Sequence, residues 1–106
     1  MTEEVHPGAG DGDLFEAIDP KLNVFALANG TDLSKGEGYR RLEWFTEGLE
    51  RGILIEAGEP GTFRVQVMSW KTGAAENRTE ALLGENLTAE EVGAALTDAI
   101  TSANDL

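Results

Sequence analysis

Few residues of this chain could carry out acid-base or nucleophilic chemistry, and they are isolated from one another. His6 is the only histidine among the 106 residues, and there is no cysteine. Nothing near His6 supplies a catalytic partner, so a Ser-His-Asp arrangement would lack its base. The absence of cysteine excludes thiolate zinc sites and cysteine nucleophiles. We therefore assign no catalytic residue and no cofactor.

The acidic residues near the N-terminus do not complete a metal site. Asp11, Gly12, Asp13 and Glu16 resemble the beginning of a calcium-binding loop. An EF-hand also needs glycine at its sixth position and glutamate at its twelfth, and neither follows here. We therefore predict no metal ligands.

The charges of this chain are divided unevenly along its length. All eight Lys and Arg residues lie between Lys21 and Arg78. Residues 1–20 carry six acids and no base, residues 79–106 carry another six acids and no base, and the formal net charge is −12. Two acidic ends repel polyanions and attract basic surfaces. This pattern argues against direct nucleic-acid binding and indicates a protein partner with a basic surface.

Aromatic and basic residues gather in the middle of the chain and could form a contact surface. If residues 35–52 form a helix, Trp44 lies opposite its apolar stripe, one turn from Arg40 and Arg41. Tryptophan and arginine are enriched in interface hot spots, which favours a contact patch. The alternative is that the N-terminal segment or the arginine stems cover Trp44. Our interaction candidates are Arg40, Arg41, Trp44, Arg51, Trp70, Glu90, Glu91 and Asp98.

Trp70 raises the same question on a predicted strand. It shares one strand face with Met68, whereas Phe63, Val65 and Val67 share the other. If helices cover the Phe63 face, the Trp70 face is open and could receive a partner. The alternatives are that the Trp70 face is the buried one or that the N-terminal segment covers it. We expect Trp70 to be at least partly buried, because a large open apolar patch is unusual in a monomer.

The elements expected to position these residues begin after a glycine-rich N-terminus. Residues 1–12 offer almost no apolar side chain, which predicts a flexible acidic tail before a single α+β domain at 13–106. A short helical segment follows the tail and ends at Pro20. Residues 22–28 (LNVFALA) are typical of a strand, and an Asn-Gly turn follows them.

A helix and a hairpin are expected in the middle of the chain. Ser34 and Glu37 fit a capping box, which predicts a helix that begins near residue 35 and ends at Gly52. Residues 53–56 and 62–70 are two β-rich runs, and the five residues between them include a Pro-Gly turn. This spacing predicts a β-hairpin.

The last third of the chain predicts a loop, a strand and a helix. Residues 71–78 are polar, and residues 79–85 are expected to form a fourth strand, although Leu82-Leu83 also suits a helix. Thr88 and Glu91 form a capping box that begins the last helix, and the glutamate suits the positive end of the helix dipole. Its apolar side consists of Val92, Leu96, Ala99, Ile100 and Ala103.

The resulting order, β-α-β-β-β-α, predicts an α+β fold with two helices on one face of a four-stranded, mainly antiparallel sheet. From Ser34 onward, the order α-β-β-β-α resembles that of the double-stranded RNA-binding domain. In that family the second helix begins with lysines that bind phosphate, whereas residues 88–91 here read Thr-Ala-Glu-Glu. The resemblance therefore implies a shared fold and argues against RNA binding.

We expect a small, non-enzymatic interaction or accessory domain that binds another protein. One alternative is an acidic nucleic-acid mimic, which requires the two acidic ends to converge on one surface. A second alternative is a small ligand-binding or enzymatic domain. Homodimerisation through an edge strand or the Trp70 face is a further possibility.

The expected location is cytoplasmic. The first lysine is Lys21, so no basic region precedes an apolar run as it does in a secretory signal. Apolar runs such as residues 24–28 are much shorter than the ~20 residues that a membrane span needs. We therefore expect no contact with a membrane.

Overall fold

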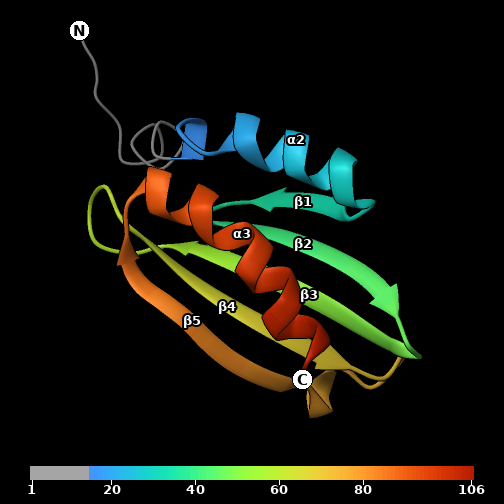
Figure 1. Ribbon diagram of the computed structural model, residues 1–106. Coiled ribbons are helices and arrows are strands. Elements are labelled where there is room, and N and C mark those ends of the chain that lie inside the picture. Colours follow the sequence, from blue (N-terminus) through green and yellow to red (C-terminus); the bar gives the residue numbers. More distant parts are fainter. Residues whose placement is uncertain (1–14) are drawn as a thin grey trace, which may run out of the picture.

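The computed structural model describes residues 15–106, which form a five-stranded antiparallel sheet and two long helices. Strands that follow one another in the chain are neighbours in the sheet, in the order β1-β2-β3-β4-β5. Both helices lie on the same face of this sheet (Figure 1). The predicted tail, residues 1–12, lies outside the described residues. The elements are α2 (Asp19–Asn29), β1 (Asp32–Gly36), β2 (Tyr39–Thr46), β3 (Leu49–Ala57), β4 (Phe63–Trp70), the short 3₁₀ helix η1 (Ala75–Asn77), β5 (Thr79–Leu87) and α3 (Ala89–Asn104).

The predicted α+β class is confirmed, but the order of the elements is wrong in its first half. The observed order is α-β-β-β-β-β-α, with five strands where four were expected. Ser34 lies inside β1, and from there the chain forms strands and the short η1 before α3, with no helix ahead of the strands. The resemblance in element order to the double-stranded RNA-binding domain is therefore wrong as well.

Residues 34–52 do not form the predicted helix, because two tight turns break this segment into strands. Glu47 and Gly48 join β2 to β3, and both have positive φ angles of 55° and 82°. Two-residue turns of this kind twist in the sense that antiparallel strands require. The alternation of inward and outward side chains along β2 and β3 could not be recognised from apolar residues alone. Arg40 and Arg51 occupy inward positions and are only 9% and 3% exposed, so the inward set does not look apolar.

Residues 22–28 belong to helix α2 and not to the predicted strand. Pro20 lies in the first turn of α2, so it begins a helix where we expected it to end one. Gly30 closes the helix in the left-handed conformation, with its N–H donating to the Ala26 carbonyl. Leu22 and Ala26 are buried, but Val24 on the other side of the helix is exposed. A helix that is apolar on both sides lacks the usual amphipathic pattern.

The second half of the chain follows the sequence prediction closely. Strands β3 and β4 form the expected hairpin, and residues 79–87 form β5, so the helical alternative for Leu82-Leu83 is wrong. At the start of α3, the Thr88 hydroxyl accepts a bond from the Glu91 N–H at 3.2 Å. The Glu91 carboxylate accepts one from the Thr88 N–H at 2.8 Å. This reciprocal pair is the predicted capping box.

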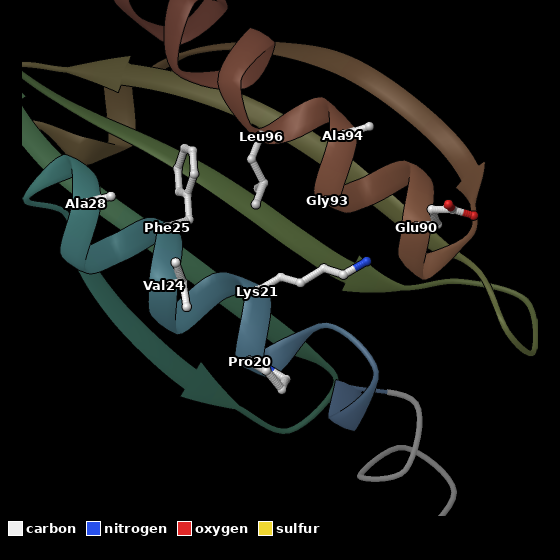
Figure 2. Close-up of a pocket in the computed structure, with 9 residues that line it drawn as sticks. All are labelled: Pro20, Lys21, Val24, Phe25, Ala28, Glu90, Gly93, Ala94 and Leu96. Carbon is white, nitrogen blue, oxygen red and sulfur yellow. The ribbon is translucent and has the colours of Figure 1, made fainter.

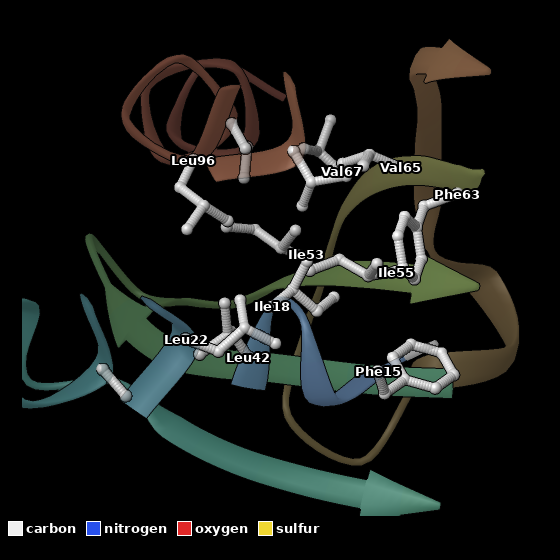
Figure 3. Close-up of a cluster of buried hydrophobic side chains, with 14 residues drawn as sticks. Phe15, Ile18, Leu22, Leu42, Ile53, Ile55, Phe63, Val65, Val67 and Leu96 are labelled. Atoms are coloured by element: carbon white, nitrogen blue, oxygen red, sulfur yellow. The ribbon is translucent and has the colours of Figure 1, made fainter. Parts of the chain in front are cut away.

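The hydrophobic core lies between the sheet and the two helices (Figure 3). Phe15 and Phe63 pack with their ring centroids 5.4 Å apart, which joins the beginning of the described chain to β4. The predicted strand face of Phe63, Val65 and Val67 is the face that the helices cover. The buried apolar residues are Phe15, Ile18, Leu22, Ala26, Leu42, Ile53, Ile55, Phe63, Val65, Val67, Val92, Leu96, Ala99 and Ala103.

Candidate interaction surfaces

Strand alternation divides the interaction candidates between the two faces of the sheet. Arg40 and Trp44 are two positions from the buried Leu42 on β2, so they share its covered face. Arg41 is on the opposite, open face, and so is Trp70 of β4. The helical patch that we predicted around Trp44 is therefore wrong, because its members lie on strands and point to opposite sides.

Arg40 holds the beginning of α2 against the sheet. Its Nε and Nη2 donate to the two carboxylate oxygens of Asp19 at 2.8 and 3.1 Å. Its Nη1 donates to the carbonyls of Gly36 and Tyr39 at 2.9 and 2.8 Å. The guanidinium carbon also lies 4.2 Å from the centroid of the Phe15 ring, within cation–π range. All three nitrogens of the Arg40 guanidinium therefore donate hydrogen bonds within the protein.

Arg51 and Trp44 hold the end of α3 in a similar way. They are directly opposite each other on β3 and β2. The Arg51 Nη1 donates to the Ala103 carbonyl at 2.8 Å, and the Trp44 Nε1 donates to the Asn104 side-chain oxygen at 3.0 Å. A cation beside the last carbonyls of a helix is favourable because this end carries the negative pole of the helix dipole. Both side chains therefore stabilise the fold.

The open face of the sheet has an apolar centre with charges around it. Gly52 has no side chain, and the side chains of Met68 and Trp70 on the neighbouring strand pack over it. A Cβ atom added at Gly52 would lie 3.5 Å from the nearest side-chain atom of each. Trp70 is half-buried, which confirms that prediction, and Met68 is buried. A small cavity of about 190 Å³ opens beside them. Its walls are formed by Arg41, Glu43, Leu54, Met68, Trp70, Ala75 and Arg78.

A larger apolar groove lies between α2 and α3 (Figure 2). Its volume is about 640 Å³, and it is open to solvent. Val24 is 67% exposed at this groove, and Leu27, one turn further along α2, is 86% exposed. Only two of its lining residues, Lys21 and Glu90, carry a charge. The groove is lined by Pro20, Lys21, Val24, Phe25, Ala28, Glu90, Gly93, Ala94 and Leu96.

Sequence reasoning missed this groove because it assigned residues 22–28 to a strand. The available signal was the spacing of Val24, Leu27 and Ala28, which are three and four residues apart and share a helix face. These three residues form one apolar side of the helix, and the buried Leu22 and Ala26 form the other.

The three acidic candidates of α3 are all exposed. Glu91 takes part in the capping box, whereas Glu90 lines the groove. Glu90, Ala94 and Asp98 are four residues apart in succession, so they follow one edge of α3. The groove is therefore bordered by carboxylates on its α3 side, and α3 carries no lysine or arginine.

Within residues 15–106, no three His, Asp or Glu side chains are grouped so that they could hold a metal ion. Neither long helix of this part has the length and apolar character needed to cross a bilayer.

The chain matches no protein-family model, no curated protein and no solved structure with which it was compared. A functional interpretation therefore has to come from the surfaces themselves.

Proposed function

We propose that this protein is a non-enzymatic protein-binding domain whose α2–α3 groove receives an amphipathic, basic segment of another protein. The observation that carries this proposal is an open apolar groove with exposed Val24, beside an acidic helix edge. The groove binds the apolar side of the partner segment, and the carboxylates of α3 attract its basic side.

The lining of the groove favours apolar side chains over a polar small molecule. Its volume falls within the roughly 300–1,000 Å³ typical of ligand sites. Small-molecule sites, however, add several convergent polar groups that orient the ligand. Here the side chains of Val24, Phe25 and Leu96 offer no hydrogen-bonding group, and the two charged residues lie on opposite helices. Helix-in-groove recognition needs only such an apolar channel.

The charge of the groove edge favours a basic partner. Glu90 and Asp98 lie on the α3 side, and only Lys21 of α2 provides a positive charge among the lining residues. The formal charge of −12 adds a long-range attraction for cationic segments. This attraction should weaken as salt rises, because the Debye length falls to about 10 Å at 0.1 M.

Three synthetic helix-forming peptides test the proposal by calorimetry with the full chain. The first has leucines on one face and lysines on the other, the second replaces lysine with glutamate, and the third replaces leucine with serine. We expect only the first to bind well, and its affinity should fall between about 20 and about 300 mM salt. Equal binding of the serine peptide would instead support a nucleic-acid mimic, which needs charge alone.

Two variants that add the same charge separate the groove from general electrostatic attraction. Val24→Glu places a carboxylate in the groove and should weaken binding of the leucine–lysine peptide by about tenfold or more. Phe45→Glu adds an equal charge on the open face, where Phe45 is 60% exposed, and should leave binding unchanged. If both variants bind as the unaltered protein does, the groove is not the site.

A further inference from the structure

The open face of the sheet carries a patterned set of residues that the groove does not use. Rows of directly opposed residues cross the strands, and each row contains both apolar or aromatic and charged positions. Phe45 is well exposed on this face, and Leu82 of β5 is 48% exposed. The rows are Tyr39–Glu56–Arg64, Arg41–Leu54–Gln66–Leu82, Glu43–Gly52–Met68–Glu80 and Phe45–Glu50–Trp70.

The charges of this face partly cancel. Its three arginines are each ion-paired with a glutamate of the same face. Arg41 lies 4.0 Å from Glu43, and Arg64 lies 3.3 Å from Glu56. Three arginines against five glutamates and Asp32, which lies opposite Glu43 on β1, leave a net charge of −3 here, compared with −12 for the chain. The glutamates are Glu43, Glu50, Glu56, Glu80 and Glu85.

From this partial cancellation of charge we propose that the open face is an interface between two copies of this chain. Two molecules of the same large negative charge repel each other, so they associate most readily through a face that carries little of that charge. A face with both acids and bases around an apolar centre can also be self-complementary under two-fold symmetry, because each arginine can meet a glutamate of the other copy. The small cavity beside Trp70 then receives an apolar side chain of the second copy.

The size of the face sets the expected strength of the dimer. Five strands about 4.8 Å apart and about eight residues long at ~3.3 Å per residue cover roughly 600 Å². A standard stable interface buries about 800 Å² on each partner. Two such sheets pack face to face at about −30°, the usual angle for twisted sheets. A reversible, concentration-dependent dimer is therefore expected.

Sedimentation equilibrium of the full chain over a wide concentration range tests the proposal. We expect a monomer–dimer equilibrium that becomes about tenfold tighter between about 20 and about 300 mM salt, since salt screens the repulsion between the copies. This dependence is opposite to that of the basic peptide in the groove. A chain that stays monomeric at the highest concentration in both salts, or a dimer that weakens with salt, would overturn the proposal.

The same two variants test the interface, but here Phe45→Glu is the disruptive variant and Val24→Glu is the control. Phe45→Glu should weaken the dimer by about tenfold or more, because it buries an unpaired carboxylate in the interface. Val24→Glu adds the same charge on α2 and should leave the dimer unchanged. Leu54→Arg, at the centre of the face, provides a second disruptive variant. A dimer that resists both open-face variants, or that Val24→Glu alone disrupts, contradicts the proposed interface whether or not the groove binds peptides.

Discussion

The helix-covered and open faces of the sheet contain the same kinds of residue in different roles. On the covered face, Arg40 and Arg51 are buried and donate to groups at the helix ends. On the open face, Arg41 and Arg64 are about two-fifths exposed and pair with glutamates at the surface. The difference shows that the position of a residue within the strand decides whether an arginine supports the fold or remains available to a partner.

The inward or outward placement of the arginines changes the charge that each face of the molecule exposes. Arg40 and Arg51 point inward and α3 carries no lysine or arginine, so the exposed edge of α3 is acidic. The open face exposes three arginines that pair with glutamates, so part of its negative charge is cancelled. We therefore propose the helical side for a basic partner and the open face for a second copy of the chain.

The strongest test of the comparison uses two neighbouring residues of β3. Ile53 is fully buried under the helices, whereas Leu54 is half-buried on the open face. Ile53→Ala should lower the free energy of unfolding by about 3–4 kcal/mol, because it leaves a cavity in the core. Leu54→Ala should cost about 1 kcal/mol or less. Urea unfolding at low protein concentration, where the proposed dimer is dissociated, measures both. Equal losses would mean that the open face packs as tightly as the core.

Adjacent arginines of β2 provide the second test. Arg40→Ala removes the bidentate partner of Asp19 and should lower the free energy of unfolding by about 2–3 kcal/mol, because a partly buried carboxylate loses its ion pair. Arg41→Ala removes a surface pair and should stay within about 0.5 kcal/mol. Urea unfolding of the two variants side by side gives the difference. A comparable loss in Arg41→Ala would show that the open face is also structural.

The parts of the fold that could be predicted from the sequence are those with strong local signals. The capping box of Thr88 and Glu91 marks the beginning of α3, and the Pro-Gly turn marks the β3–β4 hairpin. Because β4 was correctly assigned, simple alternation also placed Trp70 on the face opposite Phe63. The location of Trp70 on the open face could therefore be predicted from the sequence.

The remaining parts were predicted wrongly, mainly because tertiary contacts override the local pattern. Arg40 and Arg51 look like solvent-facing residues until their partners at the helix ends are known, so β2 and the first half of β3 resembled an amphipathic helix. Val24 and Leu27 make α2 apolar on both sides, and it resembled a buried strand. The groove depends on α2 being a helix, so it was missed together with that element.

The smallest expected effect concerns the two tryptophans. Trp44→Phe removes the indole N–H that donates to the Asn104 side chain, and it should lower the free energy of unfolding by about 1 kcal/mol. Trp70→Phe should stay within about 0.5 kcal/mol when measured at low concentration, since surface substitutions usually do. Urea unfolding again compares the two.

A double-mutant cycle shows whether the Trp44 effect comes from its bond to the end of α3. Asn104→Ala removes the acceptor, and the two single changes should be less than additive when combined, with a coupling of about 0.5–1 kcal/mol. Trp70→Phe combined with Asn104→Ala serves as the control and should be additive, because these residues share no hydrogen bond. Coupling of similar size in both cycles would mean that the end of α3 is sensitive to either face, and the division between the two faces would then not hold at this end of the sheet.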